Sequence, residues 1–111
     1  GKTIIPQRNK KEAITRPYLM RRKDLYYLFY CFRGSDDFRD GTDSYKIGYA
    51  YSKNLTEWNR KDNIIFAGVK ENWDANMMAY PSILSTGNKT YMFYNGNGFG
   101  KSGFGFAELI L

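Results

Sequence analysis

Residues 80–98 read YPSILSTGNKTYMFYNGNG, and this stretch decides the fold because the chain contains it twice. The earlier copy, residues 16–34, reads RPYLMRRKDLYYLFYCFRG and aligns with it without a gap at an offset of 64 residues. The offset places equivalent residues on one another: Pro17 on Pro81, Tyr27 on Tyr91, Phe29 on Phe93, Tyr30 on Tyr94 and Gly34 on Gly98. Self-similarity at a period of a few tens of residues indicates stacked supersecondary units.

The repeat extends beyond this stretch. Residues 45–50, YKIGYA, match residues 102–107, SGFGFA, at an offset of 57, so the second copy has a shorter loop. A length of 111 residues predicts a single domain. We therefore expect one domain built from two units, with a strand remnant and linker ahead of them. The first unit is about residues 12–66, with four strands. The second is 74–111, with three to four, and the remnant and linker are 1–11.

The central segment of the first unit, residues 25–32, is continuously apolar and reads LYYLFYCF. A strand with no polar side is covered on both faces. A buried helix is the alternative, but eight residues are few for a helix, and turn signals flank both copies. We expect strands at residues 12–20, 25–32, 45–52, 58–62 with 64–66, 77–84, 89–95 and 104–111.

No segment has helical periodicity, so the predicted class is all-β. Four-stranded antiparallel units with aromatic signatures are typical of β-propeller blades. We expect two antiparallel propeller-blade-like sheets, which together make an incomplete propeller. Pro17 lacks a backbone donor, and we expect its strand to lie at an edge or to be irregular there.

The composition excludes several chemistries. The chain has no histidine, so it has neither a Ser-His-Asp triad nor an imidazole zinc site. Cys31 is the one cysteine and lies in an apolar run, which predicts a small buried side chain and no internal disulfide. The acidic loop after residue 34 does not fit a calcium loop, because Phe38 and Ile47 occupy ligand positions. We expect no metal and no cofactor.

The net charge of +6 is unevenly placed, because residues 1–23 hold eight of the 17 basic residues and one of the 11 acidic ones. Nucleic acid would exploit such a basic segment. The alternative is a solvated basic strand and loop, so nucleic acid is not the partner we expect. No run of 18 apolar residues and no apolar leader is present, which predicts no membrane association and a cytoplasmic location.

A family resemblance adds to these observations. Residues 50–58, AYSKNLTEW, followed by Arg60 and Asp62, resemble the A-x-S-x-[DN]-L-x-x-W signature of glycosidase-like five-bladed β-propellers, related to glycoside hydrolase families 43 and 32. Trp73-Asp74, Tyr80-Pro81 and the tract YMFYNGNGFGKSGFG are similar to the C-terminal end of such proteins. The resemblance covers nearly the whole chain and implies the last two of five blades, with a ligand pocket on the ring axis.

The same resemblance bears on catalysis. In such enzymes a general base comes from the first blade, and a glutamate two residues before a proline acts as general acid. The matching positions here are Thr15 and Ala79, neither of which is acidic. Glycoside hydrolysis requires two carboxylates at a defined separation, and this chain does not supply the familiar pair. Whether the chain is an enzyme stays open, and its catalytic residues are unknown.

Five residues are candidates for carbohydrate binding. Arg16 and Tyr80 occupy equivalent positions before the two prolines and would face the axial pocket. Glu12 and Asp74 would accept hydrogen bonds from sugar hydroxyls, or are carboxylates paired within the fold. Trp73 would stack on a pyranose ring, or is a core tryptophan.

The expected function is that of a carbohydrate-binding or glycosidase-like propeller fragment that is not catalytic on its own, with a glycan as partner. The alternative is a non-catalytic, self-associating interaction module. Two blades alone leave apolar faces and strand edges exposed, which favours association. We therefore also expect a homo-oligomer that forms through these faces.

Overall fold

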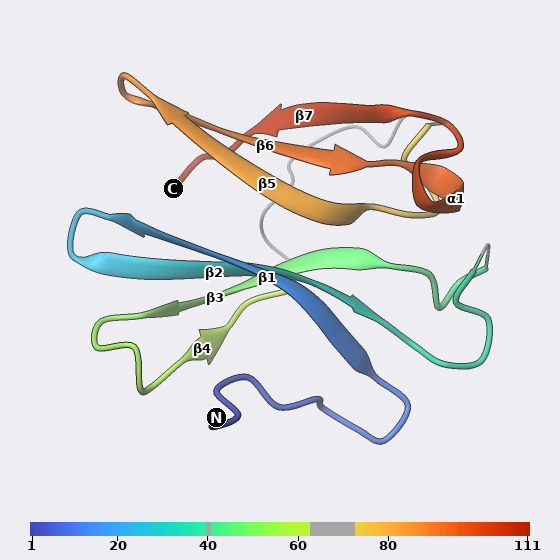
Figure 1. The fold of residues 1–111 in the computed structure, drawn as a ribbon, viewed down its shortest axis with the longest axis horizontal. Coiled ribbons are helices and arrows are strands. Elements are labelled where there is room, and N and C mark those ends of the chain that lie inside the picture. The colour runs from blue at the N-terminus through green and yellow to red at the C-terminus, as the bar shows by residue number, and fades with distance from the viewer. Residues whose placement is uncertain (40, 63–72) are drawn as a thin grey trace.

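The computed structural model describes residues 1–39, 41–62 and 73–111, and its fold is all-β, as the sequence predicts (Figure 1). Two antiparallel sheets pack face to face. The first consists, in spatial order, of β1 (Ala13–Arg22), β2 (Leu25–Arg33), β3 (Lys46–Ser52) and β4 (Asn59–Arg60). The second consists of β5 (Ala79–Thr86), β6 (Lys89–Asn95) and β7 (Phe104–Glu108).

The segments outside the sheets differ in part from expectation. The strand expected within residues 1–11 is wrong: residues 1–12 form bends and a turn. Pro6 cannot donate to a ladder, and this segment runs beside the first sheet rather than pairing with it (Figure 1). The expected continuation of the outer strand at 64–66 lies outside the described residues. No helix in the described part of the chain is long and apolar enough to cross a membrane.

Between β6 and β7 the chain makes one short helical turn, α1 (Asn97–Gly100). Gly98 and Phe99 inside it have left-handed φ angles of 63° and 59°, so it is a compact loop rather than a regular helix. In Figure 1, α1 lies at the same end of the molecule as the loop between β2 and β3. This end is where β1 and β5 begin.

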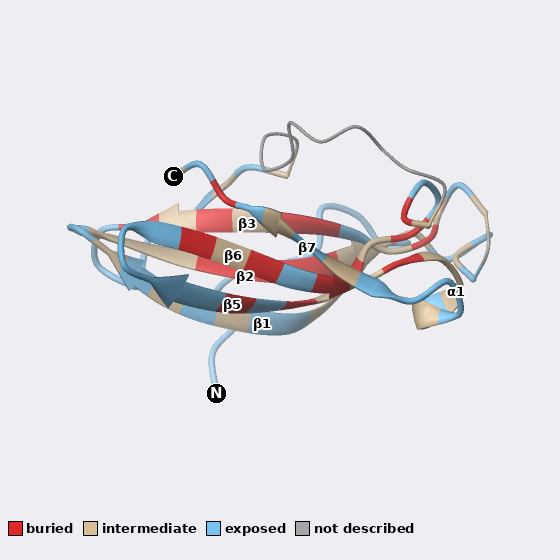
Figure 2. Ribbon diagram, turned by 90° about the horizontal axis from the view of Figure 1, so that it is seen from above, coloured by how far each residue is buried: buried red, intermediate tan, exposed pale blue. Residues whose placement is uncertain are grey.

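Each sheet has two faces, which we name from the central strands β2 and β6. The odd face carries Phe29 in the first sheet and Phe93 in the second. The even face carries Tyr30 and Tyr94. The odd face of the first sheet packs on the even face of the second, because Phe29 and Cys31 share one buried cluster with Met92 and Tyr94. Figure 2 shows the buried residues concentrated in these inner strands.

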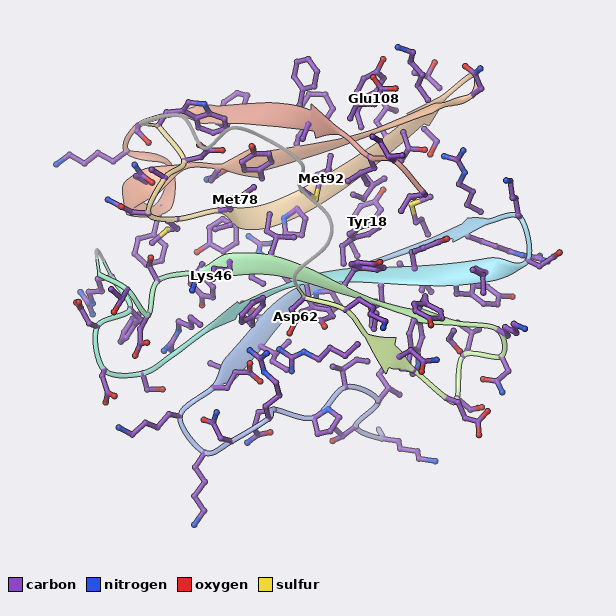
Figure 3. All side chains as sticks on the ribbon, turned by 180° about the vertical axis from the view of Figure 1, so that it is seen from behind. Tyr18, Lys46, Asp62, Met78, Met92 and Glu108 are labelled. Carbon is purple, nitrogen blue, oxygen red and sulfur yellow. The ribbon has the colours of Figure 1, made fainter. Side chains whose placement is uncertain are left out.

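Specific contacts join the two sheets. Tyr18 on β1 donates a hydrogen bond to the Ile83 carbonyl on β5 (2.9 Å), and Arg22 reaches the Thr90 hydroxyl on β6 (3.2 Å). Figure 3 shows Tyr18 pointing into the space between the sheets. The sheets are therefore held by hydrogen bonds as well as by a common apolar core.

The even face of the first sheet forms a second, smaller core. Leu28, Tyr30 and Ala50 are buried there, and Ile5 and Trp58 pack against them. The expectation that residues 25–32 are covered on both faces is thus confirmed for β2. The cover comes partly from the segment before β1.

The odd face of the second sheet lies on the outside of the molecule. Leu84, Phe93, Phe104 and Phe106 are between 37% and 79% exposed. The ring of Phe106 contacts those of Tyr91 and Phe93, with centroids 5.7 and 5.5 Å apart. This exposed aromatic face is the largest departure from a closed core in the described residues.

Candidate functional site

Both proline-containing strands are interrupted by a β-bulge at the proline. In β1, residues 16–17 lie opposite the single residue Tyr30. In β5, residues 80–81 lie opposite the single residue Tyr94. Tyr30 and Tyr94 are equivalent under the offset of 64, so the sequence repeat is reproduced in the geometry, bulge included. The irregularity expected at Pro17 is confirmed.

The residue before each proline has an uncommon backbone conformation. The φ angle is 57° at Arg16 and 61° at Tyr80. Such positive φ values are rare for large side chains, and the proline ring further disfavours helical conformations at the preceding residue. Each such position costs about 1–3 kcal/mol and is found disproportionately at ligand sites. The equivalent strain in both units makes these two residues the centre of the candidate site.

The two bulges place their side chains against one another. The guanidinium carbon of Arg16 lies 5.0 Å from the ring centroid of Tyr80, within the range of a cation–π contact. The ring of Tyr45, at the start of β3, lies 6.0 Å from that of Tyr80. Arg33, at the end of β2, lies 5.8 Å from the Tyr45 ring. We call Arg16, Arg33, Tyr45 and Tyr80 the arginine–tyrosine cluster.

Two further rings border the cluster. Phe38 packs on Arg33, with its ring centroid 3.9 Å from the guanidinium carbon. Phe99 in α1 meets Tyr45 edge to face at 5.9 Å. The cluster therefore combines two guanidinium groups with flat aromatic surfaces at the end of the molecule where both bulged strands begin. Such a surface can stack on a sugar ring and donate hydrogen bonds to its substituents.

Cys31 supports the site from behind. Its thiol accepts a hydrogen bond from the Tyr80 backbone N–H (2.9 Å) and is fully buried. Burial raises the pKa of the Cys31 thiol to about 11, although the Tyr80 N–H and the charge of Arg16 act in the opposite direction. The thiol is therefore neutral near pH 7, as predicted for a small buried side chain, and it helps to hold the strained backbone of Tyr80.

Trp73 and Asp74 form a separate group around Tyr94. The Trp73 ring stacks on the Tyr94 ring at 5.2 Å, and Tyr94 donates its hydroxyl hydrogen to Asp74 Oδ2 (2.8 Å). Trp73 also packs over Gly105, where a Cβ would lie 2.7 Å from the indole. Asp74 is buried, and its Oδ1 accepts no hydrogen bond from a described residue. Both side chains are packed into the fold next to the arginine–tyrosine cluster rather than within it.

The α1 loop joins this group to the cluster. The Asn97 side-chain carbonyl accepts the backbone N–H groups of Asn76 and Met77, each at 2.9 Å. The Asn97 N–H donates to the Trp73 carbonyl at 2.8 Å. Phe99, two residues later, reaches the cluster. A ligand at the cluster would therefore contact a loop that is anchored to Trp73.

Glu12 lies elsewhere, on the even face of the first sheet. Both of its carboxylate oxygens accept hydrogen bonds from Arg60, each at 2.9 Å, and Arg8 donates to it as well. Burial by itself would raise the pKa of Glu12, but the hydrogen bonds from Arg60 and Arg8 lower it from 4.5 to about 2. Arg60 and Arg8 also pair with Asp62, which accepts the Tyr30 hydroxyl at 2.7 Å.

The structure thus divides the five candidate residues into three groups. It brings Arg16 and Tyr80 into contact, places Trp73 and Asp74 beside them, and sets Glu12 apart. Arg33 and Tyr45 were missing from the candidates, although they flank the loop that separates the second and third strands of the first unit. The antiparallel pairing of those strands, which places both loop ends beside the start of β1, was the available signal.

Comparison with known proteins places this geometry in context. No protein-family model matches the chain. It is 32% identical over 99 residues to the uncharacterized protein Rv1502 of Mycobacterium tuberculosis strain ATCC 25618 / H37Rv. It is 31% identical over the same length to the uncharacterized protein MT1551 of strain CDC 1551 / Oshkosh. Each alignment covers 87% of this chain but 30% of the relative, so the chain spans about a third of their length.

Solved structures show the same partial correspondence. A protein described as a glycoside hydrolase superposes with a TM-score of 0.71 and 21% identity, over 94% of this chain and 34% of its own length. A structure described as a complex of BT0996 and RGII superposes with a TM-score of 0.71 and 19% identity, over 95% of this chain and 35% of its own length. At this identity the likeness establishes the fold alone: two antiparallel sheets that match part of a glycoside hydrolase.

Proposed function

We propose that this chain forms part of a glycosidase-like β-propeller, that its arginine–tyrosine cluster binds carbohydrate, and that it does not hydrolyse glycosides on its own. The observation that carries the proposal is the contact between Arg16 and Tyr80. These are equivalent residues of two units, each in a strained conformation, and the fold brings them together at 5.0 Å. The structural likeness to part of a glycoside hydrolase supports it.

The side chains suit a sugar ligand. A tyrosine ring offers an apolar surface to the C–H groups of a pyranose and a hydroxyl that both donates and accepts hydrogen bonds. A guanidinium carries five N–H donors in a fixed plane, which match the oxygen substituents of a sugar. Tyr45 and Tyr80 lie partly exposed, so these groups are accessible to a ligand.

The same cluster lacks the means of catalysis. Glycoside hydrolysis uses one carboxylic acid and one carboxylate on either side of the scissile bond. The cluster contains no carboxylate among the described residues, and the positions before its two bulges hold Thr15 and Ala79. We expect purified protein to release no aglycone from a panel of aryl glycosides.

Binding can be tested by titrating glycans into the full chain in a calorimeter. Tyr80→Ala should weaken binding about tenfold, because it removes the ring that contacts both Arg16 and Tyr45. Tyr26→Ala is the matched control, since Tyr26 also lies beneath an arginine, Arg21 at 5.5 Å, but outside the cluster. An absence of binding to every glycan, or equal losses in both variants, would contradict the proposal.

A second candidate function is self-association through the outer face of the second sheet. The observation that favours it is the exposure of Phe104 and Phe106, 79% and 62%, on a face that also carries Phe93. Contiguous exposed apolar patches of this kind mark interaction sites. We propose that a second copy of the chain covers this face.

Light scattering tests this candidate. Phe106→Lys should shift the protein toward monomer, whereas Ile4→Lys, which alters an exposed apolar residue outside the strands, should leave the mass unchanged. A wild-type protein that stays monomeric at high concentration would contradict self-association and would leave carbohydrate binding untouched.

A further inference from the structure

Resting on the proposed carbohydrate function, we propose that the arginine–tyrosine cluster selects acidic carbohydrate, with the carboxylate of a uronic acid binding to the guanidinium groups of Arg16 and Arg33. A neutral sugar would need only the aromatic rings and ordinary hydrogen bonds. Two arginines on one surface, without acidic partners among the described residues, indicate a ligand that brings negative charge of its own.

The first argument is how the ion pairs are distributed. Within the described residues, the ion pairs use four cations: Arg8, Lys11, Arg60 and Lys89. Arg16 and Arg33 take part in none of them. The carboxylates of Glu12 and Asp62 are occupied by Arg8 and Arg60 on the far side of the first sheet. The charges of Arg16 and Arg33 therefore remain available at the cluster.

The second argument is that Arg33 is already held in position. Its guanidinium lies between the rings of Phe38 and Tyr45, and one terminal N–H donates to the Gly34 carbonyl at 2.8 Å. Asp43, the acidic residue near Gly34, instead accepts the backbone N–H of Asp36 at 3.1 Å. A side chain fixed in this way loses little conformational freedom when it binds an anion.

The third argument concerns Arg16. It lies at a strained bulge and is exposed, and in the described part of the chain its side chain interacts with the Tyr80 ring and, through its charge, with Cys31. A charged side chain with so few partners gains more from an anionic ligand than from a hydroxyl group. Hydrogen bonds between charged groups are roughly twice as strong as neutral ones.

The test titrates the full chain with trisaccharides of galacturonate, glucuronate and mannuronate, and with the methyl ester of each. Esterification removes the charge and keeps the ring, so at least one acid should bind about tenfold more tightly than its ester. The difference should shrink at about 0.5 M NaCl, because salt screens exposed charges. Arg16→Gln should cost about tenfold for the acid and less than about twofold for the ester.

Arg21→Gln is the matched control, because Arg21 is also an exposed arginine of β1 that lies over a tyrosine. It should leave both affinities unchanged. Equal affinities for acid and ester, or equal effects of the Arg16 and Arg21 variants, would overturn the selection of acidic sugars and leave carbohydrate binding standing. Failure of every acid, ester and neutral glycan to bind would overturn the proposed function itself.

Discussion

Phe29 and Phe93 are the same residue in two copies of one unit, yet their surroundings are opposite. Phe29 is fully buried between the sheets, and Phe93 is 37% exposed on the outer face. The reason is that the two sheets stack in the same sense, odd face on even face, rather than as mirror partners. The comparison shows that burial here is a property of the stacking and not of the unit.

The largest effect should come from truncating this pair. Phe29→Ala should lower the free energy of unfolding by about 3–5 kcal/mol, because it opens a cavity in the shared core. Phe93→Ala should cost less than about 1 kcal/mol, because its ring is partly solvated. Urea denaturation of both variants checks this, and similar losses would show that the outer face is covered in solution.

The next effect concerns a carboxylate on each outer face. Glu12 is almost fully buried and bound by Arg60, whereas Glu108 makes an exposed pair with Lys89 at 3.4 Å. The pKa of Glu12 is lowered to about 2, so its contribution is complete above pH 4.5 and is lost as the pH falls toward 2. Glu12→Gln should remove about 2–3 kcal/mol at neutral pH, and with it the acid dependence in that window.

Glu108→Gln is the control for this measurement. Exposed ion pairs contribute between about 0 and 1 kcal/mol, so the variant should keep the acid dependence of the wild type. Unfolding curves recorded between about pH 2 and 7 would contradict the prediction if the Glu12 variant kept the full slope.

Tyr30 and Tyr94 give a third, smaller comparison, because each hydroxyl donates to an aspartate. Asp62 retains bonds to Arg60 and Arg8 when the Tyr30 hydroxyl is removed. Asp74, in contrast, accepts the Tyr94 hydroxyl through Oδ2, while its Oδ1 has no partner among the described residues. Tyr94→Phe should therefore cost about 2–3 kcal/mol and Tyr30→Phe about 1 kcal/mol, measured by thermal unfolding. The reverse order would contradict this account of Asp74.

The smallest effect should be stabilising. Arg16→Gly relieves a positive φ angle, and after the entropy cost of glycine the net gain should be about 0.5–1 kcal/mol. Arg21→Gly in the same strand, where the φ angle is ordinary, should instead destabilise. If Arg16→Gly lowers stability as much as Arg21→Gly does, the bulge is not strained. Loss of glycan binding together with a gain in stability would indicate that the strain serves the ligand site.

Much of this fold is predictable from the repeat. The offset of 64 residues located the main strands to within a few residues, and the proline in each copy marked the bulge. The direction of stacking was not predictable, because β2 is apolar on both faces and carries no alternation that would orient it. The cover from residues 1–12 was missed because Ile5 resembles a strand residue when its surroundings are unknown.

The candidate site was predictable only in part, for a similar reason. Arg16 and Tyr80 were identified because the repeat aligns them and a proline follows each. Arg33 and Tyr45 join them through tertiary contacts that no local pattern records. Glu12 was expected at the sugar-facing surface, and its pairing with Arg60, 48 residues away, depends on how β4 packs beside the segment before β1.

The stacking sense carries a further consequence for assembly. An interface that joins unlike faces is head-to-tail, so each added sheet presents a new face of the kind it has just covered. Such growth ends only when the rotation closes a ring or when a terminal face is blocked. At the first sheet the blocking groups are Ile5 and the ion pairs of Glu12, which cover Tyr30. Removing them would free a surface complementary to the exposed phenylalanines of another molecule and would risk open-ended fibres.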